Sequence, residues 1–127
     1  MNLSALPLLF LLTTGCAHEL STSWPAGSAW PEHFELVEPP LNEEAMRATS
    51  AAVTYVASRP YRKSLFEGCP PGKSLKATTF KAGEIYVVQV DPDLDVCPSA
   101  YTHDWFEVYA VSAEGQILAR RPPAEAL

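Results

Sequence analysis

The sequence predicts a small α+β protein, in which one N-terminal helix packs on an antiparallel meander of about four strands. Three observations lead to this expectation. A single helical pattern covers residues 43–58, runs of β-branched and aromatic residues follow it, and the last of these runs reads as a closing hairpin. A helix followed by a succession of strands is typical of the α+β class. The length of 127 residues leaves room for one domain.

The helix is expected to begin after Pro39-Pro40, where Asn42 is a good N-cap and acids fill the first turn. Its expected apolar face repeats every three to four residues, with alanines alongside that allow close approach to a sheet. This face comprises Met46, Thr49, Val53 and Val56, with Ala45, Ala52 and Ala57 beside them. Pro60 ends the helix, because the residue before a proline disfavours the helical conformation.

The remaining elements are expected strands separated by turn residues, with the turn over residues 112–115 joining the last two. The expected strands cover residues 74–80, 84–90, 105–111 and 116–120, and residues 64–68 are a short further candidate. Alternation in the strand over 105–111 places Phe106, Val108 and Ala110 on one face. The opposite face of that strand carries Trp105, Glu107, Tyr109 and Val111. The order of helix and meander, and the closing stretch 108–118, resemble small exported bacterial domains of the cystatin-like and PepSY-like kinds.

The N-terminus carries a short apolar run, Leu3 to Leu12, followed by Leu12-Thr13-Thr14-Gly15-Cys16. Ten residues are too few to span a bilayer and suit the apolar core of a signal peptide. The sequence ending in Cys16 resembles the lipobox of bacterial lipoproteins, although Thr13 and the uncharged start depart from that pattern. The resemblance implies that Cys16 carries a lipid and that the protein lies in the bacterial cell envelope, at the outer membrane facing the periplasm. The alternatives are a plainly cleaved secretory signal and an ordinary buried N-terminal segment that contains a cysteine by chance.

The cysteine count depends on that assignment. The chain has three cysteines, and lipidation of Cys16 leaves Cys69 and Cys97 as the pair available for a disulfide in an oxidising compartment. The bridge would close a loop of about 30 residues and contribute about 3–4 kcal/mol in the chain-entropy model.

The region between the anchor and the helix reads as a tether. The expected division is a signal peptide over 1–15, a tether over 16–40, the α+β domain over 41–121 and a tail over 122–127. Proline, glycine and serine interrupt any regular period in the tether. Because tethers are usually poor in aromatics, we expect some of Trp24, Trp30 and Phe34 to pack on the domain, with residues 34–37 as a candidate strand.

The distribution of charged residues indicates which classes of binding partner suit the protein. A net charge of −6 argues against nucleic acid. Seven bases against one acid occur between Arg47 and Lys81, which makes an acidic protein partner one hypothesis. Aromatic residues on the sheet face away from the helix are a second. The candidate partner-binding residues are Trp105, Tyr109, Tyr101, Arg59, Arg62 and Lys63.

Two patterns resemble reactive sites. Cys97 and His103, with Asp104, have the residue types of a thiol hydrolase, but a ready disulfide partner for Cys97 favours a structural bridge. Asp91, Asp93 and Asp95 resemble half of a calcium loop, yet Val96 stands where an EF-hand needs glycine and Thr102 where it needs glutamate. We therefore expect a solvated turn there, with no metal and no cofactor.

These observations predict a lipid-anchored, non-enzymatic binding or accessory module of the envelope. A small envelope thiol hydrolase using Cys97 and His103 is the alternative from another class. An inhibitor or immunity protein is a further alternative, suggested by small size and acidity.

Overall fold

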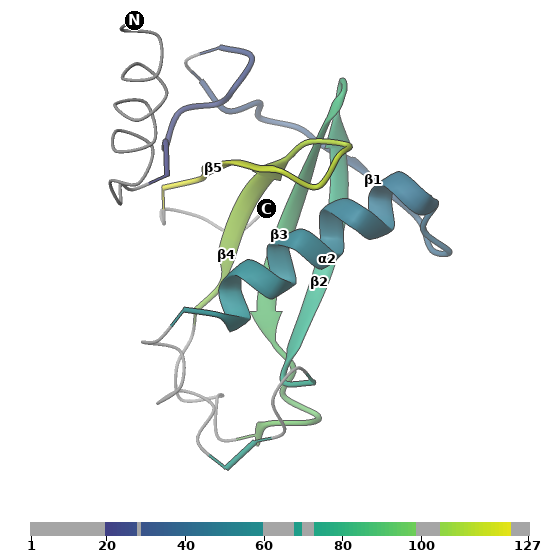
Figure 1. Cartoon of the computed structure of the whole chain (residues 1–127), viewed down its shortest axis with the longest axis vertical. Coiled ribbons are helices and arrows are strands. Elements are labelled where there is room, and N and C mark those ends of the chain that lie inside the picture. The colour runs from purple at the N-terminus through teal and green to yellow at the C-terminus, as the bar shows by residue number, and fades with distance from the viewer. Residues whose placement is uncertain (1–19, 28, 60–67, 70–72, 99–104, 123–127) are drawn as a thin grey trace, which may run out of the picture.

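The computed structural model describes residues 20–27, 29–59, 68–69, 73–98 and 105–122. One helix packs on a five-stranded antiparallel sheet with strand order β1-β2-β3-β4-β5 (Figure 1). The predicted α+β class is confirmed, with one strand more than expected. The elements are β1 (Glu35–Leu36), α2 (Glu43–Ala57), β2 (Leu75–Ala82), β3 (Ile85–Pro92), β4 (Glu107–Val111) and β5 (Ile117–Arg120). The extra strand is the candidate at residues 34–37, and residues 64–67 of another expected strand lie outside the described residues.

Helix α2 begins and ends close to the predicted bounds. Asn42 is its N-cap, and the Asn42 Oδ1 atom accepts a hydrogen bond from the Ala45 N–H at 2.8 Å. Glu43 and Glu44 occupy the first turn, where the helix dipole favours acids. At the other end, the Ser58 N–H donates to the Thr54 carbonyl at 3.0 Å.

The buried stripe of α2 differs from the expected one by a small rotation. Ala45, Ala48, Ala52 and Val56 are fully buried, whereas Met46 is 57% exposed. The prediction that Met46 belongs to the apolar face is therefore wrong. Small side chains occupy the buried positions because they let the helix backbone lie close to the sheet. A methionine at these positions would increase the distance between the helix and the sheet.

Both faces of the sheet are covered. Under α2, the alternate residues Tyr86, Val88, Val90, Tyr109 and Val111 form one core. The opposite face of the sheet contributes Val87, Val108, Ala110 and Ala119 to a second core. The predicted alternation in β4 is confirmed, with Val108 and Ala110 opposite Tyr109 and Val111.

The second core is covered by the segment that precedes the helix. Trp24 is 8% exposed and packs there together with Trp30 and Phe34. The rings of Trp24 and Trp30 lie 5.2 Å apart, centroid to centroid. The expectation that these aromatics pack on the domain is confirmed. Within the region expected to be a tether, Leu20, Trp24, Trp30, Phe34 and Val37 pack on the domain.

The two edges of the sheet are paired to different extents. At one edge, β1 pairs only with the end of β2, through Glu35 with Lys81 and Leu36 with Phe80. At the other edge, the Arg120 N–H of β5 donates to the Ser21 carbonyl at 2.9 Å. The start of the described chain therefore lies beside β5 (Figure 1).

Candidate functional site

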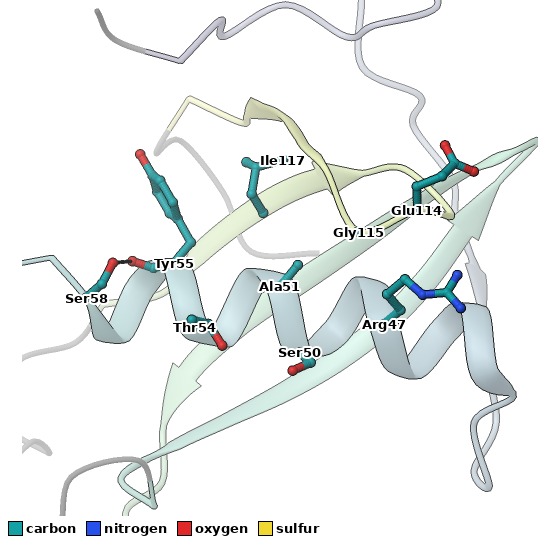
Figure 2. A pocket seen from close by; sticks show the side chains of 9 residues that line it. All are labelled: Arg47, Ser50, Ala51, Thr54, Tyr55, Ser58, Glu114, Gly115 and Ile117. Atoms are coloured by element: carbon teal, nitrogen blue, oxygen red, sulfur yellow. Dashed lines mark hydrogen bonds between the residues drawn. The ribbon is translucent and has the colours of Figure 1, made fainter. Parts of the chain in front are cut away.

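An open groove of about 560 Å³ lies between the exposed side of α2 and the turn that joins β4 to β5 (Figure 2). Arg47 and Glu114 stand at one end of it, and Tyr55 and Ser58 at the other. We call it the α2 groove. Its lining residues are Arg47, Ser50, Ala51, Thr54, Tyr55, Ser58, Glu114, Gly115 and Ile117.

The first end of the groove is built by Arg47. Its Nη1 donates to the Ala113 carbonyl at 2.8 Å, and its Nη2 lies 3.1 Å from Glu43 Oε1. Gly115 packs directly on the arginine stem, because a Cβ atom there would lie 3.0 Å from Arg47 Cγ. Gly115 also has a φ of +87°, which side chains disfavour. The turn is thus held against α2 at this end.

The second end is built by stacked aromatic and basic groups. Tyr55 meets the buried Tyr109 edge to face, with ring centroids 5.3 Å apart. Arg59 Nη1 donates to the Tyr55 hydroxyl at 2.8 Å, and the guanidinium carbon lies 5.4 Å from the ring centroid. Arg59, a predicted partner-binding residue, therefore lies next to the groove.

The middle of the groove combines polar and apolar groups. Ser50 and Thr54 are exposed and present hydroxyls one helical turn apart, which can donate or accept hydrogen bonds. Ala51 and Ile117 supply partly buried apolar surface. The lining holds neither a thiol nor an imidazole, and its acid and its base are Glu114 and Arg47. This chemistry suits the non-covalent binding of an amphipathic partner.

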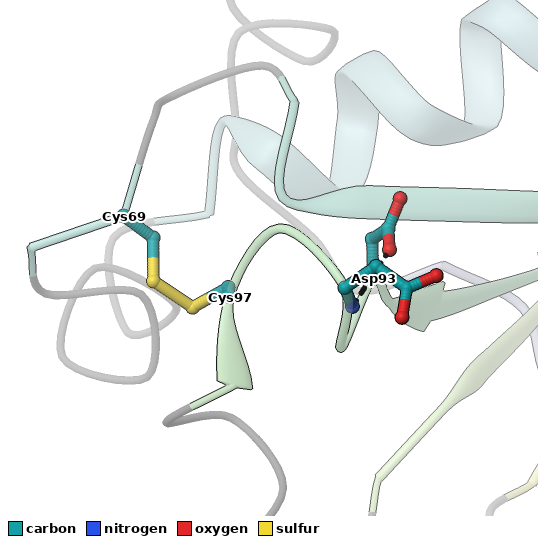
Figure 3. Close-up of a disulfide and its surroundings, with 4 residues drawn as sticks. Cys69, Asp93 and Cys97 are labelled. Carbon is teal, nitrogen blue, oxygen red and sulfur yellow. Dashed lines mark hydrogen bonds between the residues drawn. A yellow bond between two sulfur atoms is a disulfide. The ribbon is translucent and has the colours of Figure 1, made fainter.

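The predicted disulfide is confirmed. Cys69 and Cys97 are bonded, with Cα atoms 5.5 Å apart (Figure 3). Cys97 is fully buried. The bridge lies just beyond the last registered pair of β2 and β3, Leu75 with Pro92, and so closes the open end of that hairpin.

The acidic turn next to the bridge positions Cys97. The Asp93 carbonyl accepts from the Cys97 N–H at 2.8 Å, and Asp93 Oδ1 accepts from the Asp95 N–H at 3.1 Å. Asp91 accepts a hydrogen bond from Gln89 Nε2 at 3.2 Å. Across the described residues, no group of three or more His, Cys, Asp or Glu side chains could hold a metal ion.

The prediction that Tyr109 belongs to an exposed aromatic patch is wrong. Tyr109 is fully buried under α2, and its hydroxyl donates to Glu107 Oε1 at 2.5 Å. Arg120 Nη2 donates to the other carboxylate oxygen of Glu107 at 3.2 Å. Trp105 is partly buried on the same side of the sheet. The face that carries Trp105 and Tyr109 is covered by the helix, so Tyr109 cannot contribute to an exposed surface.

Several predicted residues lie outside the described part of the chain. They are Cys16, Tyr101, Arg62, Lys63 and His103. Sequence reasoning in turn missed Ser50, Thr54 and Glu114 in the α2 groove. Exposed hydroxyls and acids on a helix or turn are ordinary solvent-facing residues, so no sequence pattern marked them.

Comparison of the chain with known proteins gives no match among protein-family models, curated proteins or solved structures. Within the described residues, no helix has the length and apolar character needed to cross a membrane.

Proposed function

We propose that this protein is a non-enzymatic binding module of the bacterial cell envelope, anchored through a lipid on Cys16 at the periplasmic side of the outer membrane. In this proposal, the α2 groove is the surface that contacts a protein partner.

The pairing of Cys69 with Cys97 is the observation that best supports the proposed lipid anchor. The Cys69–Cys97 bond accounts for two of the three cysteines and leaves Cys16 as the third. A disulfide also suits an exported protein, because thiols are kept reduced in the cytosol. A lipidated Cys16 therefore needs no thiol partner.

The state of Cys97 also weighs against the alternative of a thiol hydrolase. A nucleophilic cysteine must be a free thiolate within reach of a base. Cys97 is buried and bonded to Cys69, so such an enzyme would have to reduce its own bridge first. The groove, with hydroxyls, apolar surface and one charge of each sign, favours binding over chemistry.

Replacing the proposed anchor residue tests the first half of the proposal. We expect the full chain, expressed in a bacterial host, to fractionate with membranes and to carry the mass of a diacylglycerol on its first mature residue. Cys16→Ser should lose that mass and appear in the soluble periplasmic fraction, because the thioether can no longer form. Thr22→Ser is the control and should remain in the membrane. An unlipidated wild-type protein, or a Cys16→Ser protein that stays lipidated, would contradict the anchor.

Site-specific photo-cross-linking tests the second half. A photoreactive residue at Ser50 should give a discrete adduct with an envelope protein, whereas one at Thr78 should not. Both positions are exposed, but Thr78 lies on β2, away from the α2 groove. Thr54→Arg should abolish the adduct formed from Ser50 by filling the groove, and Thr78→Arg should leave it intact. Equal adducts from both positions, or an adduct that survives Thr54→Arg, would contradict the groove.

A further inference from the structure

The polypeptide is fixed to the sheet much closer to Cys16 than the sequence suggested. The Ser21 carbonyl accepts a hydrogen bond from the backbone N–H of Arg120 in β5 at 2.9 Å. Next to it, Trp30 Nε1 donates to the Thr22 carbonyl at 2.9 Å. Trp24 is then buried against the sheet. Ser21 is therefore a fixed point of the domain.

Chain length limits how far this fixed point can lie from the anchor. Five residue steps separate Cys16 from Ser21. Even fully extended, they span at most about 18 Å. A tether running to Pro40 would have reached about 85 Å, which is several times longer. A lipid on Cys16 would thus hold the β5 edge of the sheet next to the membrane surface.

The surface around the fixed point has the composition expected of a membrane contact. Ser21, Thr22 and Ser23 are exposed, and the partly buried Trp30 lies beside them. Aromatic rings with a polar group are favoured at membrane–water interfaces. The sequence has no acid from Leu20 to Pro31 or from Gly115 to Pro122. The second stretch contains Arg120, whose charge is paired with Glu107, and the partly buried Arg121. In a chain of net charge −6, this is a surface that anionic headgroups would not repel.

Resting on the proposed anchor at Cys16, we propose that the β5-edge surface, formed by Ser21, Thr22, Ser23 and Trp30, lies against an anionic lipid bilayer. The strand order then places β2 on the far side of the domain, because three strand spacings of about 4.8 Å separate β2 from β5. Lys76 and Thr78 of β2 would lie farther from the lipid than Ser21 and Ser23.

Paramagnetic broadening from the membrane surface tests this orientation. The lipidated full chain, labelled with nitrogen-15, is placed in phosphatidylglycerol-containing nanodiscs with a gadolinium-chelating lipid headgroup. We expect the amide signals of Ser21 and Ser23 and the Trp30 indole signal to lose most of their intensity. The amide signals of Lys76 and Thr78 should keep theirs, because the broadening falls steeply with distance.

A lengthened connection provides the control. A long flexible Gly-Ser segment inserted between Ala17 and His18 should restore much of the intensity at Ser21 and Ser23, since the domain can then leave the surface. Broadening that is equal at Ser23 and Thr78 in a lipidated protein would overturn the orientation but not the anchor. If the insertion left the broadening unchanged, the short connection between Cys16 and Ser21 would not be what holds the domain at the membrane. Absence of lipid on Cys16 by mass spectrometry would overturn the proposed function, and the orientation with it.

Discussion

Replacing Trp24 with alanine is expected to lower the free energy of unfolding by about 3–5 kcal/mol, as truncation of a buried tryptophan does in other proteins. Trp24 is 8% exposed and contacts the core that includes Val108 and Ala110. The substitution removes one of the two tryptophans that cover that face of the sheet, and the more deeply buried of them. For a domain of this size, the melting temperature should fall by at least about 12 °C.

Thermal and urea unfolding followed by circular dichroism measure this effect. Met46→Ala is the matched control, because Met46 is also a large apolar residue but is 57% exposed. It should change the stability by less than about 0.5 kcal/mol. If Trp24→Ala proved as mild as Met46→Ala, the N-terminal segment would be a tether after all, and the short connection to Cys16 would be lost with it.

Removing the disulfide is the second change with a large expected effect. The bonded residues are 28 apart, and a closed loop of that length contributes about 3–4 kcal/mol by restricting the unfolded chain. The double variant Cys69→Ser/Cys97→Ser should therefore be less stable by about that amount. Its folded structure should persist, because β2 and β3 pair along their whole length without help from the bridge.

Reductant supplies the control for this prediction. Wild-type protein in dithiothreitol should unfold at the lower urea concentration of the double variant, and the double variant should not respond to dithiothreitol. A wild-type protein that is equally stable with and without reductant would mean that the bridge restricts little in the unfolded chain.

Local patterns predicted most of the secondary structure. Asn42, the paired acids after it and Pro60 bracket α2 to within one residue of its observed end at Ala57. Runs of valine and aromatic residues located β3 and β4, and the turn before Gly115 located β5. These signals depend on backbone conformation, which neighbouring residues largely determine.

The errors concern which element covers which face. Alanine is only weakly hydrophobic, so the sequence pattern includes the exposed Met46 in the helical stripe and omits the buried Ala48. Alternation in β4 showed two faces but not which one the helix covers, so Tyr109 was placed on an exposed surface. The aromatic content before the helix predicted that Trp24 could pack on the domain, but not on which face. That face depends on a contact between segments more than sixty residues apart, which no local pattern encodes.

The position of the bridge has a consequence for proteolysis. The Cys69–Cys97 bond and the paired strands β2 and β3 together form a closed ring of polypeptide. A single cut anywhere between the two cysteines opens the ring but leaves both ends of the chain covalently joined. A nicked molecule would keep β4 and β5 attached to the N-terminal half of the chain. A cut within the ring would separate the C-terminal strands from the N-terminal half only if the bridge were also reduced.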